Sequence, residues 1–486
     1  MKLGVTIFFL LTITNLFAQS NEIKREIKYT AEAGTIISTN GETPFWLRAN
    51  QYGIVPNQSP IFTLRGSVSS DYKKAIIKED QYKLSKLDWG YGLNIVGNVG
   101  KENQFLIPEA YVKAKYGAFE IYAGRRKEIF GLVDSTLSSG SYIWSGNALP
   151  MPKIQISTPN FVPLGFTKDF LSFKGNYAHG WFENSRTDVK NFYLHQKSLY
   201  FRLGKPDWKF HFYGGFNHQV QWGGTTFSKN RQLPSDIEDY FGIVIGKSLA
   251  VESDTIKFTP SDALNRAGNH LGTVDLGFDI RLTNWDVFLY RQSIFEDGSL
   301  YNLNNITDGL NGIALTNRTV SNHNFIIRKI VFEIFNSTSQ GGNFDGNNIN
   351  SRLRGQDNYL NNGQYFEGWS YMRNGIGTPF VLNRYEILGN PTSPYFYNNR
   401  TQAFFLGMHL TSNQKLDIYF KLSHSNNLGS YVYLLDKITS QFSGYMKVSK
   451  PLIFFKSTFM DLSISYDQGS LLKSNMGVSF GVRKQW

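Results

Sequence analysis

The 486-residue sequence contains no cysteine. Disulfide bonds, thiolate metal sites and lipid attachment through a cysteine are therefore excluded. Long hydrophobic runs are also missing, because beyond the first 18 residues no segment reaches the roughly 18 apolar residues of a membrane-spanning helix. Any membrane-embedded structure in this chain would have to be built from strands.

Signatures of common catalytic sites are absent as well. The sequence has no G-x-S-x-G, no H-E-x-x-H and no glycine-rich phosphate loop. Its eight histidines include no pair with the spacing of metal ligands. Ser172 and His179 could be forced into a nucleophile and base, but no third group orients them. We predict no enzymatic activity, no cofactor and no bound metal.

The first residues do contain an export signal. Lys2 precedes an apolar run that ends at Phe17, and the small residue Ala18 follows. This pattern is typical of a signal peptide that is cleaved after Ala18, with an uncleaved membrane anchor as the alternative. We predict a signal peptide over residues 1–18 and a single exported domain over residues 19–486.

Aromatic residues are abundant and positive charge is in excess. Phe, Trp and Tyr make up 15% of the chain, and the formal net charge is +12. This composition fits a soluble β-protein or a transmembrane β-barrel, whose strands are apolar on one face only. A basic exported protein favours acidic polymers or anionic lipid head groups as partners, and not nucleic acid.

Two-residue alternation recurs along the whole chain and predicts strands. In residues 416–423 the apolar Leu416, Ile418, Phe420 and Leu422 alternate with Asp417, Tyr419, Lys421 and Ser423. Similar runs lie at 90–99, 109–116, 118–127, 197–204, 208–216, 273–282 and 459–467. The fifteen prolines fall between these runs or at their ends, as expected because proline cannot donate a ladder hydrogen bond.

Connection lengths predict the topology. Short connections lie at 116–118, 204–208, 282–285, 411–415 and 450–456, and long ones at 39–60, 128–152, 221–270 and 339–399. Outer-membrane barrels place short turns in the periplasm and long loops outside. With both termini periplasmic, the pattern predicts an all-β fold, a transmembrane antiparallel barrel of 18 strands. Two weaker strands, 152–157 and 309–317, leave 16 as the alternative, and 234–246 predicts a short helix in an outer loop.

The last strand keeps its alternation to the final residue. Met476, Val478, Phe480 and Val482 share one face, and Trp486 is in phase with them. The last strand of a barrel must pair with the first, because a bilayer tolerates no open edge. A terminal aromatic residue resembles the signal read by the barrel insertion machinery. We predict that Trp486, Phe480 and Val482 form this signal; an ordinary last strand of a sandwich is the alternative.

The long loops carry the candidate binding residues. Aromatic rings stack on sugar rings, while amides, carboxylates and guanidinium groups bond to hydroxyls and acidic groups. The segment 124–186 is rich in such residues, and we predict a polysaccharide site there, with Arg126 pointing into the lumen. The candidates are Arg126, Trp144, Asn147, His179, Trp181, Glu183 and Arg186. The alternative is that Trp144 and Trp181 pack a loop plug or join an interfacial aromatic girdle.

Several segments together resemble the Wzi family of outer-membrane capsule-assembly proteins, in the form common among Bacteroidetes-type bacteria. They are TPFWLRANQYG (43–53), GRRKEIFGLVDSTLSSGSYIWSGNALPMPKIQI (124–156), KGNYAHGWFE (174–183), LPSDIEDYFGIVIG (233–246) and NHLGTVDLGFD (269–279). The resemblance implies a barrel of about 18 strands in the cell outer membrane, with loops and short helices obstructing the lumen.

The resemblance also implies a function. It suggests a lectin-like protein that binds capsular or related surface polysaccharide and helps to assemble or anchor it at the cell surface. The expected partners are this capsular or exopolysaccharide, outer-membrane lipid and lipopolysaccharide, and the insertion machinery during biogenesis. A porin-like diffusion channel for small solutes is the alternative, and the long loops favour the blocked lumen.

Overall fold

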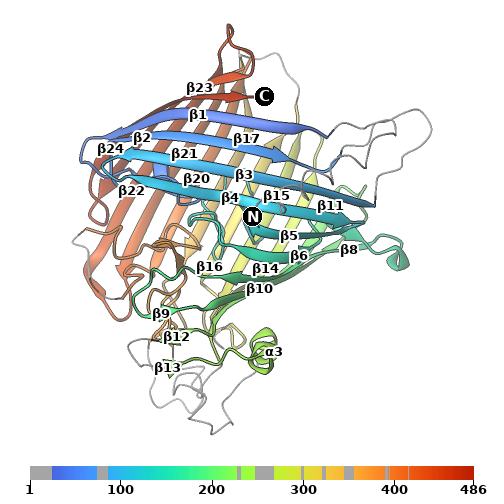
Figure 1. Cartoon of the computed structure of the whole chain (residues 1–486), viewed down its shortest axis with the longest axis vertical. Coiled ribbons are helices and arrows are strands. Elements are labelled where there is room, and N and C mark those ends of the chain that lie inside the picture. Colours follow the sequence, from blue (N-terminus) through green and yellow to red (C-terminus); the bar gives the residue numbers. More distant parts are fainter. Residues whose placement is uncertain are drawn as a thin grey trace, which may run out of the picture.

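A closed antiparallel β-barrel dominates the computed structural model of the chain (Figure 1). The structure describes residues 25–73, 86–226, 231–246, 267–296, 300–319, 324–343, 355–388, 392, 394–413 and 415–486. The predicted signal peptide, residues 1–18, lies outside these ranges. The main sheet has 19 strands, but the two-residue β7 (Val162–Pro163) only continues the position of β6 along β8, so the wall has 18 strand positions.

The wall strands follow one another in chain order. They are β1 (Ile27–Ser38), β2 (Ile61–Ser70), β3 (Leu87–Gly100), β4 (Gln104–Tyr116), β5 (Phe119–Arg125), β6 (Lys153–Ser157), β8 (Leu171–Trp181), β10 (Tyr193–Leu203), β11 (Phe210–Trp222), β14 (Asn269–Arg281), β15 (Trp285–Phe295), β16 (Gly309–Asn317), β17 (Phe325–Asn336), β20 (Thr401–Ser412), β21 (Asp417–Gly429), β22 (Leu434–Pro451), β23 (Thr458–Gly469) and β24 (Asn475–Gln485). The predicted count of 18 is confirmed, and β6 and β16 are the two weaker strands on which it depended.

Short helices and strands lie in the loops between the wall strands. In the described residues they are the helices α2 (Phe45–Arg48) and α3 (Ile237–Ile245), the 3₁₀ turn η2 (Gly165–Thr167), and the two-residue strands β9 (Val189–Lys190), β12 (Thr225–Thr226), β13 (Arg231–Gln232), β18 (Ser370–Tyr371) and β19 (Asn374–Gly375). The predicted helix at 234–246 is confirmed as α3. No helix within the described ranges is long and apolar enough to cross a membrane.

The first and last strands close the barrel. They pair from Thr30 opposite Gln485 to Ser38 opposite Gly477. Beyond this ladder, the N–H of Trp486 donates to the carbonyl oxygen of Tyr29 at 3.0 Å. Every wall strand therefore has a neighbour on both sides, which is the condition for placing a sheet in lipid.

The outward and inward faces of the wall follow the predicted alternation. On β21, Leu422 is 41% exposed on the outside, whereas the amino group of Lys421 lies 5.0 Å from the ring centroid of Trp46 inside the lumen. On β24, Val478 and Phe480 are exposed, and so is Trp486 directly after it. An apolar outer surface and a polar inner face are the pattern of a transmembrane barrel.

Proline placement is one point on which the sequence prediction is wrong. The run expected from residue 109 is in fact the strand β4 from Gln104, so Pro108 lies within a strand. Opposite it, the ladder between β3 and β4 shifts register between Asn94 and Val96. A β-bulge tolerates the missing proline donor, because the extra residue is already unpaired there.

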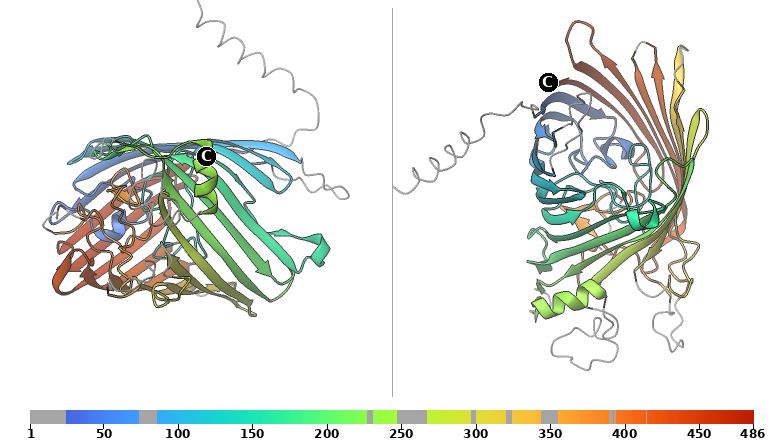
Figure 2. Two further views of the ribbon diagram at one scale, coloured as in Figure 1. Left: turned by 90° about the horizontal axis from the view of Figure 1, so that it is seen from below. Right: turned by 90° about the vertical axis from the view of Figure 1, so that its right-hand side faces the viewer.

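The main apolar core lies inside the barrel and is built largely from loops. Buried side chains from 45–55, 137–151 and 359–396 pack with one another and with inward residues of the wall. Both views of Figure 2 show these loops inside the curve of the wall. Helix α2 is held there by Trp46, whose Nε1–H donates to Ser423 Oγ at 3.0 Å. The predicted obstruction of the lumen is confirmed.

Candidate functional site

The loop that follows β5 crosses the lumen and is called here the plug loop (residues 126–152). The backbone N–H of Leu132 donates to Asp275 on β14 at 2.9 Å, and Asp134 forms an ion pair with Lys329 on β17 at 2.5 Å. The N–H of Ser139 donates to Glu333 at 2.7 Å. The plug loop is thus fastened to the wall far from the strand it leaves.

Two predicted sugar-binding residues lie within the plug. Trp144 is only 7% exposed, and its ring meets that of Phe130 edge-on at 6.0 Å. The side chain of Asn147 accepts from the N–H of Asn50 at 3.2 Å and donates to the carbonyl of Gly375 at 3.3 Å. Asn147 thus joins the plug loop to other lumenal segments, whereas the contact of Trp144 with Phe130 lies within the plug loop.

Glu183 and Arg186 form a buried ion pair at 3.2 Å. Arg186 also donates to the carbonyl of Gly368 at 3.3 Å, and Glu183 accepts from the N–H of Met372 at 3.0 Å. Burial raises the pKa of Glu183, although Arg186 opposes the shift. The pair fastens the loop after β8 to the segment 367–372.

His179 and Trp181 lie on the outward face of β8. Trp181 is 39% exposed, and the His179 ring lies 5.0 Å from it and 5.9 Å from the Trp222 ring. This cluster is separated from the lumen by the wall. Trp181 therefore lies where an interfacial aromatic girdle would place it, and Trp144 lies inside the loop plug. The sugar-binding role of both residues stays a prediction.

Arg126 points into the lumen, as predicted, and joins a charge network. It pairs with Glu120 at 2.6 Å and with Glu128 at 3.0 Å, while Lys153 pairs with Glu128 at 2.8 Å. Burial acts to raise the pKa of Glu128, but Lys153 and Arg126 outweigh it and lower that pKa below its usual value. The two cations and two carboxylates balance one another.

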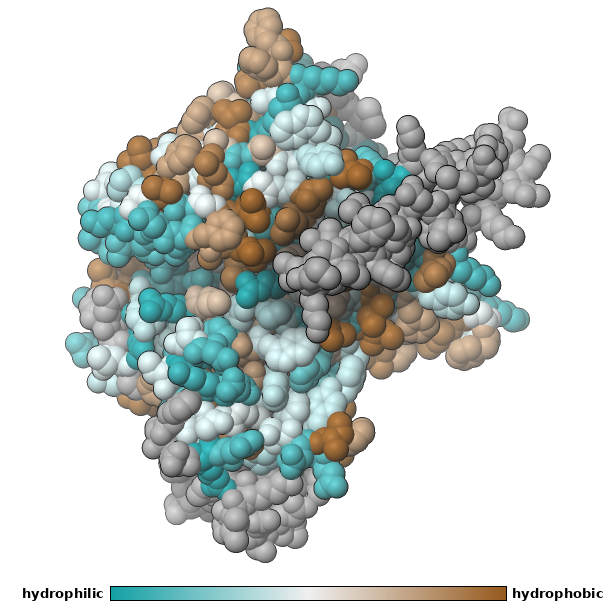
Figure 3. Space-filling model, viewed as in Figure 1, coloured by the Kyte–Doolittle hydropathy of each residue, from teal (hydrophilic) through white to brown (hydrophobic). Residues whose placement is uncertain are grey.

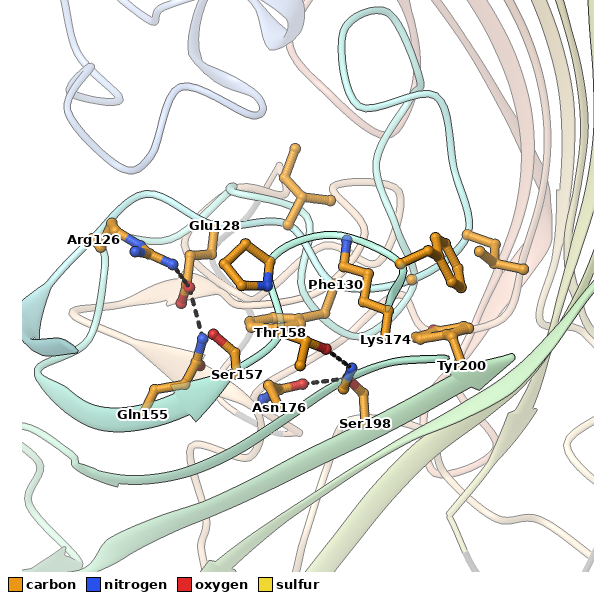
Figure 4. Close-up of a pocket in the computed structure, with 16 residues that line it drawn as sticks. Arg126, Glu128, Phe130, Gln155, Ser157, Thr158, Lys174, Asn176, Ser198 and Tyr200 are labelled. Carbon is orange, nitrogen blue, oxygen red and sulfur yellow. Dashed lines mark hydrogen bonds and ion pairs between the residues drawn. The ribbon is translucent and has the colours of Figure 1, made fainter. Parts of the chain in front are cut away.

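A cavity of about 240 Å³ lies beside this network (Figure 4). Its polar lining includes Arg126, Gln155 and Thr158, and its aromatic lining includes Phe130 and Tyr200. Figure 4 shows Lys174 reaching into it from β8. Within the described residues, no hydrogen-bond or ion-pair partner is seen for this ammonium group. Sequence analysis did not single out Lys174, although it is in phase with the inward residues Ser172 and Asn176.

A second cavity, of about 120 Å³, opens at the outer end of the barrel and is called here the outer-mouth cavity. Three loops line it, at 42–58, 385–386 and 472–475. Tyr385 is 44% exposed at its rim, and the Arg384 guanidinium lies 5.0 Å from the Tyr385 ring centroid. Lys473 and Glu42 are 44% and 50% exposed and lie 3.7 Å apart.

The outer-mouth cavity combines an exposed ring with amide, carboxylate and ammonium groups. Asn57 and Gln58 add their side-chain amides to the charged groups. None of the seven predicted residues lines this cavity. Little in the sequence indicated this cavity, because the residues that line it come from three loops far apart in sequence. No set of three or more His, Asp or Glu side chains in the described ranges is arranged to hold a metal ion.

The closed barrel, its apolar outer surface and its loop-filled lumen define a plugged outer-membrane β-barrel. A family model described as capsule assembly protein Wzi matches residues 18–380. The chain belongs to this family, and its location is the outer membrane.

The chain is also similar to several solved structures. Wzi of Escherichia coli, described as an outer-membrane carbohydrate-binding β-barrel involved in group 1 capsule assembly, is 14% identical with a TM-score of 0.58, covering 94% of this chain and 83% of that one. OccAB2 of Acinetobacter baumannii and a BenF-like porin of Pseudomonas fluorescens are each 8% identical with a TM-score of 0.46, covering 95% of this chain and 98% of theirs. No curated protein sequence matches the chain.

Proposed function

We propose that this protein binds capsular or related surface polysaccharide at its outer-mouth cavity and helps to assemble or anchor the polymer at the cell surface. Family membership and the carbohydrate-binding Escherichia coli protein support a glycan ligand. The observation that carries the proposal is the outward-facing combination of the Tyr385 ring with the amides and charges around it. The function proposed is binding, with no catalytic step.

The chemistry of the outer-mouth cavity suits a sugar unit of a polymer. A sugar ring can stack on Tyr385, while Asn57 and Gln58 bond to hydroxyls and Lys473 attracts an acidic substituent. Base–aromatic stacking is worth about 1–3 kcal/mol, and a sugar stack is expected to be no stronger. Retention of a long polymer then depends on repeated binding of its units, which raises the effective concentration of each next unit.

The membrane-embedded partners belong to the same proposal. The outward face of the wall would contact outer-membrane lipid and lipopolysaccharide, and the insertion machinery would bind the chain during biogenesis. Residues 1–18 would be cleaved on export, leaving 19–486 as one barrel domain.

Glycan binding tests the proposal. The purified barrel is titrated with the surface polysaccharide of its own host, and Tyr385→Ala is expected to weaken binding about fivefold or more, since losing about 1 kcal/mol already gives that factor. Lys473→Gln should weaken binding of an acidic polymer in a salt-dependent way. The matched control is Lys174→Gln, which removes a cation from the other cavity.

Two outcomes contradict the proposed site. If Tyr385→Ala and Lys473→Gln bind as the wild type does while Lys174→Gln binds weakly, the polymer uses the cavity beside Arg126. If the wild type binds no polysaccharide of its host, the proposed function is wrong.

A further inference from the structure

Helix α3 has an exposed apolar face that no described part of the chain covers. Ile237, Phe241 and Ile245 are 70%, 64% and 74% exposed. Residues four apart lie on one side of a helix, so these three side chains form a continuous stripe. In Figure 3, brown side chains gather at the place that α3 occupies in Figure 1. A large exposed apolar stripe marks an interaction surface.

The opposite side of α3 packs on the outer surface of the barrel wall. The Tyr240 hydroxyl lies 2.8 Å from the hydroxyl of Tyr177 on β8 and 3.2 Å from Nδ1 of His195 on β10. Ile243 is 2% exposed and packs with Val220 and Trp222 of β11.

The alternation of β11 shows that this packing is on the outside. Its intervening residues point inward: Gln219 Nε2 donates to the carbonyl of Ile143 at 3.3 Å, and Gln221 Nε2 donates to that of Gly368 at 2.8 Å. Because successive side chains of a strand point to opposite faces, Val220 and Trp222 face away from the lumen. Helix α3 therefore covers part of the surface that a barrel presents to its surroundings.

The helix lies at the height of the outer membrane surface. Trp181 and Trp222, which end β8 and β11, stand beside it in an aromatic cluster, and such girdles mark the membrane–water interface. Towards the middle of the same wall, Val274 and Leu276 of β14 are 41% and 60% exposed. The stripe on α3 thus continues the lipid-facing belt of the wall.

Both ends of α3 are held in this position. At its start, the N–H of Asp236 donates to the Asp239 carboxylate at 3.2 Å, which caps the first turn. At its end, the amino group of Lys197 on β10 donates to the carbonyl of Val244. A cation at a helix C-terminus is favourable for the helix dipole.

We propose that α3 is an interfacial membrane helix, which lies flat on the barrel and inserts Ile237, Phe241 and Ile245 among the acyl chains of the outer leaflet. The continuity of its stripe with the lipid-facing belt favours lipid over a protein partner. Interfacial helices bury their apolar face about 5–10 Å into the boundary between head groups and acyl chains. The inference needs the outer-membrane location and is independent of polysaccharide binding.

The absence of cysteine makes a direct test possible, because a single introduced thiol can carry a fluorophore. Phe241→Cys is labelled, and the full barrel is reconstituted in phosphatidylcholine vesicles with a nitroxide either near the headgroup or near the end of an acyl chain. Leu276→Cys, at the middle of β14, is the lipid-facing control. Asp207→Cys, in the exposed turn after β10, is the aqueous control.

The label at position 241 is expected to lose about as much fluorescence as the one at 276, with the shallow nitroxide more effective at 241 and the deep one at 276. The label at 207 should be quenched little by either lipid. Quenching at 241 as weak as at 207 would overturn the proposal, and Ile245→Cys repeats the measurement at a second site. If the label at 241 is protected from water but not quenched by either lipid, and this protection disappears on dilution of the protein, the stripe contacts a second copy of the chain.

Discussion

At the scale of single residues, the ion pair between Asp134 and Lys329 couples the plug loop to pH. Burial acts to raise the pKa of Asp134, but bonds to Lys329 and Thr136 outweigh it, and the pKa lies below its ordinary value. A carboxylate whose pKa is lowered by folding stabilises the folded state above its unfolded pKa. That contribution is lost as the pH falls through the folded pKa.

We therefore expect the plug to loosen in acid. As the pH falls below about 4, the ordinary pKa of an aspartate, the wild type should lose more thermal stability than Asp134→Asn, whose side chain cannot titrate. At neutral pH the substitution should cost about 1.5–3 kcal/mol, since it weakens hydrogen bonds to a charged group. Thermal unfolding of the detergent-solubilised barrel at several pH values measures both effects. Equal acid sensitivity of the two proteins would show that another group controls the loss.

For single residues, the sequence predicted which face of the wall a side chain occupies, but it did not predict which residues line the candidate binding site. Alternation correctly placed Arg126 in the lumen and Leu422 outside, because the period of a strand is local. It could not separate binding from packing, since plug cores and sugar sites use the same residue types. Trp144 and Asn147 are fully engaged inside the plug. Tyr385 and Lys473 were not predicted as site residues, because only the folded loops bring them together.

At the scale of elements, β24 carries both the closing ladder and the predicted insertion signal. Its apolar residues Val478, Phe480 and Val482 are exposed on the outside, and Trp486 continues the face at 60% exposure. Whether the insertion machinery reads this terminal ring stays a prediction.

Deleting Trp486, or making Trp486→Asp, is expected to reduce insertion while export through the signal peptide continues. The physical reason is that the terminal ring and the strand face would no longer form one apolar surface. The amount of heat-resistant, membrane-embedded barrel measures insertion, and Trp486→Phe is the conservative control. Wild-type levels of folded barrel in the deletion variant would remove Trp486 from the signal.

The elements themselves were largely predictable, with one instructive failure. Period-two patterns and turn lengths predicted the 18 strands, because each strand has one lipid-facing side. The helical apolar spacing of 234–246, after Pro234 and Asp236, predicted α3. The start of β4 was missed because a bulge accommodates Pro108 within the strand. Loop structure could not be predicted, since helix α2 and the plug loop are fixed by contacts with distant strands such as β21 and β17.

At the scale of the whole molecule, the lumen is filled by the protein's own core. Side chains of α2, the plug loop and the segment 359–396 are buried together there. A close-packed interior leaves few voids larger than a water molecule, so free passage of solutes is not expected. This argues for the binding function over the diffusion channel that the sequence left as an alternative.

Conductance separates these two functions. The wild type in planar bilayers is expected to show no steady open current. Removing the plug loop, by replacing residues 127–151 with a short glycine-serine linker, should raise conductance if the variant still forms a barrel. Heat-resistant migration on gels checks that it does. A steady current through the intact protein would favour the porin-like channel.

The pairing of Thr30 with Gln485 joins the first wall strand to the last, and this has a consequence for synthesis. The first strand cannot gain its second neighbour until β24 has been made and exported. Contacts between such distant segments require the largest loop closure the chain can offer, and they form slowly. Until β24 has paired with β1 the wall has unpaired edge strands, and exposed strand edges favour aggregation.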